Sequence, residues 1–282
     1  TWLLRIVTRT SLDLLAKRKA KLGPRIRPTD RGAAGSTEDE LRTRDGATWI
    51  EPLADADAID PGLSPEELLA CRRDLRLAFV AALQRLPARQ RAALLLADVC
   101  GWRAPQVADT LETTPAAINS ALQRARATLR ARDETPASFA PDPLEPTHAR
   151  LLDAYVAAFE AYDIDALVDV LREDVTLCMP PYDLWLRGHA DVRTWMLGRG
   201  SGCRGSRLVP VAANGTRAFG QYRRAPSGAY HPWSLVVLEI DGGDARSGTE
   251  PRIASFIHFL DVAAIFPRMG LPADLPPTPD AT

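Results

Sequence analysis

Residues 113–130, TTPAAINSALQRARATLR, carry arginines, side-chain amides and hydroxyls but no acidic residue. Arginine binds phosphates well, and Ser, Asn and Gln can hydrogen-bond the edges of bases, so these residue types suit contact with nucleic acid. The alternative is an ordinary solvated helix face, which basic amphipathic helices form about as often. The residue types alone leave both interpretations open.

The spacing of apolar residues predicts an amphipathic helix in this stretch. One side of that helix is apolar and holds Ile118, Leu122, Ala125 and Leu129. The other side is small, polar or cationic and holds Ala116, Ser120, Gln123, Arg124 and Ala127. The preceding RAPQVADTL predicts a second short helix and ETT a turn, which together complete a helix-turn-helix.

The whole segment LPARQRAALLLADVCGWRAPQVADTLETTPAAINSALQRARATLR, residues 86–130, resembles region 4 of an extracytoplasmic-function (sigma-70 family, group 4) RNA polymerase sigma factor. Its Leu-Pro-x-x-Gln-Arg opening, Ala108 and closing ALQRARATL lie in register with that family. The resemblance implies that this domain reads the −35 promoter element and docks on the polymerase β-subunit flap. The expected DNA contacts are Thr114, Ala116, Asn119, Ser120, Gln123, Arg124, Arg126 and Arg130.

Two positions depart from the family pattern. Glu112 stands in the turn where glycine is common, and a left-handed conformation costs a non-glycine residue about 1 kcal/mol or more, so we expect a slightly remodelled turn. Ala121 stands where many relatives have arginine. Phosphate contacts are therefore expected to be retained better than base specificity.

The N-terminal TWLLRIVTRTSLDLLAKRKAK predicts a helix with a basic C-terminal end. It resembles the end of sigma region 2, which implies that Arg9, Lys17 and Arg18 engage the −10 element and that core polymerase is a partner. Because the resemblance starts late in region 2 and Thr1 is not a methionine, the sequence is expected to be N-terminally truncated.

Charge and proline content divide the rest of the chain, whose net charge of −1 hides a basic start followed by an acidic stretch. A helix is predicted to begin at Ser64-Pro65, and the proline-rich segment near residue 140 predicts a domain boundary. The expected divisions are 1–28, end of region 2; 29–63, acidic linker; 64–133, region 4; 134–146, linker; 147–268, second domain; and 269–282, disordered tail.

In the second domain, helices are predicted from about Thr147 to Tyr162, from Asp163 and after Gly188. The strand-like runs are VTLCM, LWLR, RLVPVAA, TRAFGQYRR, HPWSLVVLEI and RIASFIHFL. This order indicates an α+β domain, and residues 148–266 resemble the SnoaL-like, NTF2-like superfamily. The expected fold class is multidomain: an all-α helix-turn-helix region 4 with a remnant of region 2, followed by an α+β NTF2-like cone.

A pocket for a small hydrophobic ligand is one expectation for the cone. Its candidate lining is Tyr155, Phe159, Met179, Trp185, Trp195, Tyr222, Trp233, Phe256 and His258. The same residues could instead simply fill the cone as core. His231 or His258 could form a general acid/base pair with Asp174 or Asp183, but a structural role for each histidine is the alternative. No catalytic residue is assigned. No metal-ligand spacing and no cofactor motif occurs in the sequence.

The sequence predicts a sigma factor that is not an enzyme, whose C-terminal domain modulates it by packing against the linker and region 4. Its expected partners are core RNA polymerase and promoter DNA, with no membrane, because no apolar run approaches the length of a bilayer. The expected location is cytoplasmic. Two alternatives stay open: a one-component regulator with a ligand-binding SnoaL-like domain, and a SnoaL-like enzyme with a DNA-binding appendage.

Overall fold

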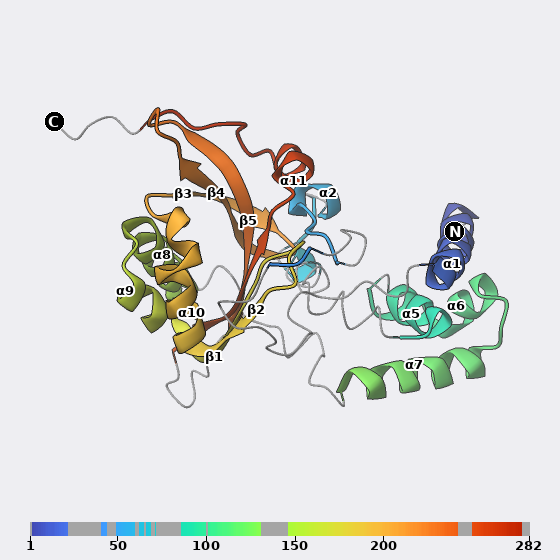
Figure 1. Cartoon of the computed structure of the whole chain (residues 1–282). Coiled ribbons are helices and arrows are strands. Elements are labelled where there is room, and N and C mark those ends of the chain that lie inside the picture. The colour runs from blue at the N-terminus through green and yellow to red at the C-terminus, as the bar shows by residue number, and fades with distance from the viewer. Residues whose placement is uncertain are drawn as a thin grey trace. The chain divides into compact units, whose positions relative to one another are not determined.

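A computed structural model of the chain describes residues 2–21, 41–43, 49–59, 62–64, 66–68, 71, 86–99, 101–130, 146–241 and 250–277. These residues divide into two units (Figure 1): those within 1–26 and 73–139 form one, and those within 27–72 and 140–282 form the other. Each unit has its own hydrophobic core. Most of the helix predicted to begin at Ser64 lies outside the described residues.

The first unit is helical. Its elements are α1 (Trp2–Lys21), α5 (Ala88–Leu94), a π-helical turn (Leu95–Val99), α6 (Ala104–Thr110) and α7 (Pro115–Arg130). Helix α6 begins where the sequence predicts, with Pro105 in its first turn and the Gln106 side chain accepting a hydrogen bond from the backbone N–H of Arg103 at 2.9 Å. Leu12 of α1 packs against the core that α5, α6 and α7 share.

The second unit is a curved sheet with helices on both faces (Figure 1). Its helices are α2 (Asp55–Ala58), α8 (Pro146–Ala161), α9 (Ile164–Asp169), α10 (Gly188–Leu197), a 3-10 turn (Arg199–Cys203) and α11 (Val262–Arg268). Its strands are β1 (Leu171–Cys178), β2 (Trp185–Arg187), β3 (Arg207–Ala213), β4 (Thr216–Arg224), β5 (Tyr230–Asp241) and β6 (Arg252–Phe259). The six predicted strand runs and the helix after Gly188 are thereby confirmed.

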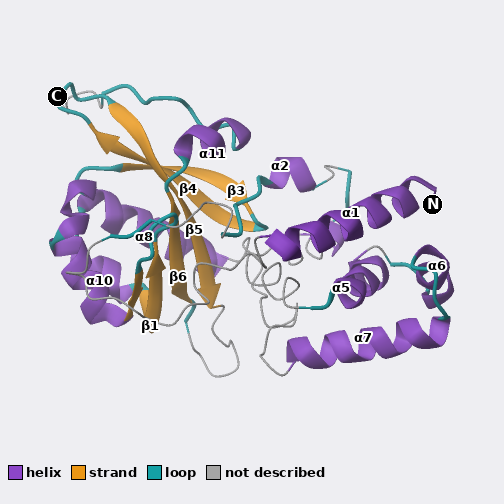
Figure 2. Cartoon of the chain, turned by 45° about the vertical axis from the view of Figure 1, so that its right-hand side comes forward, coloured by secondary structure: helices purple, strands orange, loops and turns teal. Residues whose placement is uncertain are grey.

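The strand order is β2-β1-β6-β5-β4-β3, and every neighbouring pair is antiparallel except β1 with β6. Successive residues of a strand face opposite sides of a sheet. On β5, Val236 and Leu238 therefore join the core under α8, α9 and α10, whereas Leu235 and Val237 are buried on the other face. Figure 2 shows helices on both sides of the sheet, with α11 opposite α8 and α10.

Part of the acidic linker is docked on the sheet. We call residues 41–43 and 49–58 the docked linker. Thr43 forms an antiparallel bridge with Tyr182, Ala54 forms one with Ala213, and the Trp49 ring lies 5.4 Å from the Trp185 ring. The sequence identifies this stretch only as a connection between domains; the structure adds that it belongs to the sheet unit.

The docked linker is anchored at the tight turn between β3 and β4. Asn214 and Gly215 both have positive φ, as a two-residue hairpin loop requires. The Asn214 side-chain oxygen accepts the Leu53 N–H at 3.0 Å, and the Asn214 N–H donates to the Leu53 carbonyl at 2.9 Å. Asp55, a buried carboxylate, accepts the Gly215 N–H at 2.8 Å. Polar groups on both sides of the contact are thus satisfied.

The C-terminal segment differs from the disordered tail expected for residues 269–282. Through Pro277 the structure describes it, and it runs along the sheet. Tyr230 and Leu275 exchange two backbone hydrogen bonds of 2.9 Å, and the Tyr222 hydroxyl donates to the Pro272 carbonyl at 2.7 Å. Proline prevents a helix here, but it leaves carbonyls free to accept hydrogen bonds, which is why proline content alone misled. Residues 278–282 lie outside the described part.

Candidate nucleic-acid interface

Helix α7 has the two faces that its sequence predicts. The apolar side is buried against α5 and α6 and consists of Ile118, Leu122, Ala125 and Leu129. The opposite side is exposed and includes Thr114, Ala116, Asn119, Ser120, Gln123 and Arg124. The amphipathic prediction is therefore confirmed, and six of the eight residues assigned to region 4 DNA contacts present one continuous exposed surface. We call these six residues the reading face.

Thr114 has a structural role as well. Its hydroxyl accepts the Ala117 N–H at 3.2 Å, so it caps the N-terminus of α7. The positive end of the helix dipole and the remaining unpaired N–H groups at this end favour a negatively charged phosphate. Substitution of Thr114 would therefore affect both the stability of α7 and any DNA contact at this end.

Arg126 is exposed but is held by an ion pair within the helical unit. Its guanidinium forms a two-pronged ion pair with Asp98, with Nε at 3.1 Å from Oδ2 and Nη2 at 2.6 Å from Oδ1. The pair fixes α7 to the π-helical turn after α5, and the hydrogen bonds that Arg126 donates to Asp98 raise the pKa of Arg126 further. Arg126 is thus oriented by the carboxylate of Asp98, which no motif in the sequence singles out. The side chain of Arg130 lies outside the described residues.

The turn between α6 and α7 is not remodelled. Glu112 adopts the left-handed conformation, with φ of 51°, at the position where glycine is common. The Thr113 N–H donates to the Ala108 carbonyl at 2.9 Å, so the turn is closed despite the unfavourable residue. The Glu112 carboxylate pairs with Arg9 of α1. Because both side chains are largely exposed, this ion pair contributes little stability, but it occupies a residue assigned to DNA contact.

The structure describes the side chains of two of the three basic residues predicted to contact DNA from α1. Arg9 and Lys17 are exposed, whereas the side chain of Arg18 lies outside the described residues. The apolar side chains Ile6, Val7 and Leu14 are also exposed, with relative exposures of 42%, 50% and 60%. The helical spacing of these apolar residues was predicted. Among the described side chains of α1, Leu12 packs against the core of the helical unit, whereas these three remain exposed.

The nine residues expected to line a pocket in the cone do not come together around one. Tyr155, Phe159, Met179, Trp195 and Phe256 are members of the main core cluster under the helices. The other four are not in that cluster. Trp185 packs at a tilt on Trp49, Tyr222 packs edge-on against Phe266 of α11, the centre of the Trp233 ring lies 3.3 Å from the Arg223 guanidinium, and His258 contacts Ser234 and the edge of Phe256. Because successive strand residues face opposite sides of a sheet, Trp185 is separated from the core residue Leu186, whereas His258 stays on the same face as Phe256.

His258 belongs to a buried polar network on three adjacent strands. Ser234 donates to the Gln221 oxygen at 2.9 Å, and its hydroxyl lies 3.1 Å from Nδ1 of His258. Gln221 in turn donates to Ser206 at 3.1 Å. Burial lowers the pKa of His258 to about 4, with a smaller contribution from the nearby positive charge of Arg223. The imidazole is therefore neutral in the folded chain at physiological pH.

This burial predicts acid sensitivity of the sheet unit. The unfolded chain binds a proton at His258 below its ordinary pKa of 6.5, whereas the folded chain does so only near 4, so stability falls as pH drops through that window. We expect a loss of about 2 kcal/mol in the free energy of unfolding between pH 7 and pH 5. Urea unfolding followed by tryptophan fluorescence measures it. The loss should persist in His231→Gln, an exposed histidine, and should shrink in His258→Gln; an unchanged pH dependence in His258→Gln would contradict the prediction.

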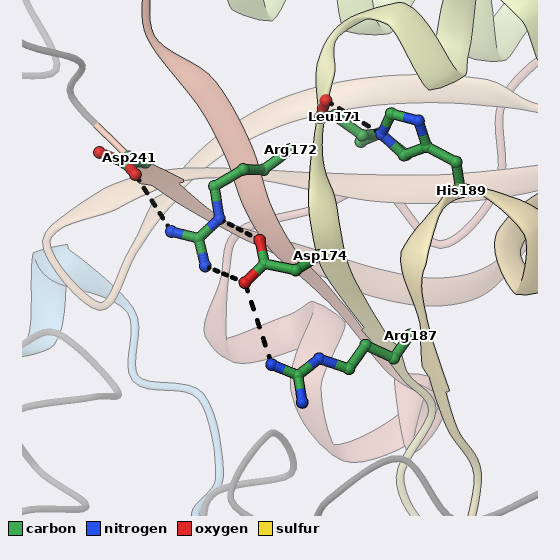
Figure 3. Close-up of polar contacts among 6 residues, drawn as sticks. All are labelled: Leu171, Arg172, Asp174, Arg187, His189 and Asp241. Atoms are coloured by element: carbon green, nitrogen blue, oxygen red, sulfur yellow. Dashed lines mark hydrogen bonds and ion pairs between the residues drawn. The ribbon is translucent and has the colours of Figure 1, made fainter.

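The histidine and aspartate pairs considered for acid/base chemistry are not formed. Figure 3 shows that Asp174 is bound by Arg172, whose Nη2 is 2.9 Å from Oδ2, and approached by Arg187 at 3.9 Å. His189 in the same view contacts the Leu171 carbonyl at 3.3 Å. His231 instead pairs with Asp274 of the C-terminal segment, where both side chains are exposed. These residues secure strands and the C-terminal segment to one another.

Residues 76–129 match the family model for sigma-70 region 4. Over 281 residues the chain is 38% identical to the ECF RNA polymerase sigma factor SigG of Mycobacterium tuberculosis, covering 98% of this chain and 71% of that protein. The chain belongs to the ECF RNA polymerase sigma factors. The ECF sigma factor SigJ of the same species is 34% identical over 179 residues, covering 62% of this chain and 48% of SigJ.

The crystal structure of SigJ has the same fold, with a TM-score of 0.56 at 22% identity, over 96% of this chain and 83% of that one. This ECF sigma factor therefore combines a helical region 4 unit with an α+β sheet unit, as predicted. Membership of the family implies core RNA polymerase and promoter DNA as partners. These findings favour the sigma factor over the one-component regulator and the appended enzyme.

None of the described helices is both long and apolar enough to cross a bilayer. Within the described ranges, no group of three or more His, Cys, Asp and Glu side chains could hold a metal ion.

The main feature that sequence reasoning missed is the docked linker. Its one signal was the apolar run Trp49-Ile50 and Pro52-Leu53 inside an otherwise acidic, polar stretch.

Proposed function

We propose that the reading face of α7 recognises the −35 element of the promoter. Asn119, Ser120, Gln123 and Arg124 approach base edges, where amides and guanidinium groups can discriminate between bases. Arg126, oriented by Asp98, and Arg130 contact phosphates. The single observation that carries this proposal is the continuous exposure of these polar side chains on a helix whose opposite face is fully buried in region 4.

We further propose that Arg9, Lys17 and Arg18 of α1 engage the −10 element. The pairing of Arg9 with Glu112 supports a resting arrangement in which this contact must open before Arg9 reaches DNA. Since the pair is exposed, opening it costs little.

The sheet unit serves in this proposal as a regulatory rather than a catalytic domain. Support comes from the docked linker, because the linker connects the two DNA-contacting regions in the sequence and is held by the sheet through Trp49, Leu53, Ala54 and Asp55. A docked linker restricts how the two regions can be placed on polymerase and promoter. Release and docking of the linker would thereby change the output of transcription.

A reversible disulfide tests this role. Ala54 and Ala213 are buried bridge partners on antiparallel segments, a geometry that brings Cβ atoms within reach of a disulfide. Ala54→Cys with Ala213→Cys should lock the linker when oxidised and release that constraint when reduced. We expect run-off transcription by the reconstituted holoenzyme to differ at least about threefold between the two states. Ala54→Cys alone, treated identically, is the control; equal output from locked and reduced double variants would refute the regulatory role.

A further inference from the structure

A groove of about 510 Å³ lies where the docked linker meets the sheet unit. Its walls come from the linker, from the loop after β1, from the end of β6 and from α11. All of these segments belong to one unit. The volume is within the range of small-molecule sites, and the groove is separate from the cone interior, which core side chains fill.

Flat and rigid apolar groups form half of the lining residues. They are Trp49, Pro52, Pro180, Pro181, Tyr182 and Phe259. Proline and aromatic faces pair well with a planar ring, because both surfaces are flat and lose little conformational entropy on contact. The shape of the walls therefore favours a planar ligand over a flexible chain.

The indole N–H of Trp49 indicates which polar group a ligand would carry. Its side chain is only 3% exposed, yet its indole N–H has no hydrogen-bond acceptor among the described residues. A buried donor without an acceptor costs about 1–3 kcal/mol. Trp49 also lines the groove, so a ligand that carries a hydrogen-bond acceptor would satisfy this donor once a small shift of the indole exposes its buried Nε1.

The charges at the groove select against an anionic acceptor. Glu51 and Asp261 line it together with Arg268, so carboxylates outnumber cations. The Asp261 carboxylate also caps α11 by accepting the Ala264 N–H, which keeps it at the groove. A neutral carbonyl can accept the indole N–H without approaching two like charges.

We propose that this groove binds a planar, neutral small molecule bearing a carbonyl group, and that binding holds the linker docked. The second half of this statement rests on the proposed regulatory function. Since the ligand contacts both linker and sheet, it binds only the docked state. A ligand at ten times its Kd therefore lowers the population of the released state about tenfold.

Binding is tested with 9-fluorenone and fluorene, which differ only in the carbonyl, by ligand-observed NMR on the full chain. We expect fluorenone to bind at least about fivefold more tightly than fluorene and than the anion fluorene-9-carboxylate. Trp49→Phe should abolish the preference for fluorenone over fluorene while keeping an aromatic wall. Equal binding of the three probes, or no binding of fluorenone, overturns the proposal.

Neighbouring alanines on α11 locate the site. Ala264 lines the groove and Ala263 does not, and both are exposed. Ala264→Trp should fill the groove and weaken fluorenone binding at least about tenfold, whereas Ala263→Trp should bind normally. Helical content by circular dichroism confirms that both variants fold. Equal binding by the two variants places the ligand elsewhere and overturns the proposal.

The link to the docked state has its own readout. At ten times its Kd, fluorenone should slow hydrogen exchange of the Asp57, Ile59 and Asn214 amides about tenfold, because these N–H groups are bonded within or to the docked linker. Unchanged exchange with bound fluorenone overturns the linker half of the proposal. This measurement does not involve transcription, so a disulfide lock without effect on transcription would refute the regulatory role while leaving the binding site intact.

Discussion

Replacing Gln123 and Arg124 together with alanine is expected to weaken binding of the holoenzyme to its −35 element by about 100-fold or more. Each well-placed amide or guanidinium contact to a base is worth about 1–3 kcal/mol, and both side chains are exposed at the centre of the reading face. Neither side chain contributes to the core of the helical unit, whose α7 residues lie on the opposite side. The loss should therefore be one of recognition rather than of folding.

Fluorescence anisotropy with a labelled promoter duplex, measured at several salt concentrations, separates base contacts from phosphate contacts. The double variant should lose discrimination between the selected −35 sequence and a scrambled one. Loss of a phosphate contact alone would instead weaken both duplexes equally and flatten the salt dependence. Arg217→Ala removes an exposed arginine from the sheet unit and is the control for net charge. Unimpaired discrimination in the double variant would rule out this reading face.

Trp49→Ala is expected to release the linker from the sheet. Truncating a buried tryptophan costs about 3–5 kcal/mol, and here nearly all of that loss falls on the docked state, since Trp49 packs on Trp185 of the sheet unit. The exchange rates of the Asp57, Ile59 and Asn214 amides should rise at least about 100-fold. Transcription by the variant should change in the direction opposite to the disulfide lock.

Two matched comparisons isolate the linker effect. Asp55→Ala removes the acceptor of the Gly215 N–H and should increase exchange at the same amides, whereas Asp57→Ala on the same short helix is exposed and should not. Trp233→Ala truncates a tryptophan that contacts Arg223 rather than the linker. If Trp49→Ala left linker exchange at the level of Trp233→Ala, the linker would be held by something other than this ring.

Much of the fold could be predicted because its signals are local. The stripe from Ile118 to Leu129 has the period of a helix, and the six strand runs are short, rich in β-branched and aromatic residues and separated by turn residues. Asp163 illustrates the same point at the level of one residue, since its carboxylate accepts the Ala166 N–H at 3.0 Å and starts α9 where a second helix was expected.

The features that escaped prediction depend on contacts between distant residues. Asp98 and Arg126 are separated by 28 positions, and Leu53 and Asn214 by 161, so no sequence period relates them. The candidate pocket residues illustrate a related difficulty: aromatic residue type does not tell which face of a curved sheet a side chain occupies, and register shifts in β4 and β5 alter that assignment further.

The docked linker also changes how the two units are tied together. The sheet unit is built from two separate stretches of the chain, one between α1 and α5 and one after α7. We expect the two fragments to stay associated after a single proteolytic cleavage between Arg130 and Pro146. The N-terminal fragment would still contact the sheet through Trp49, Leu53 and Asp55.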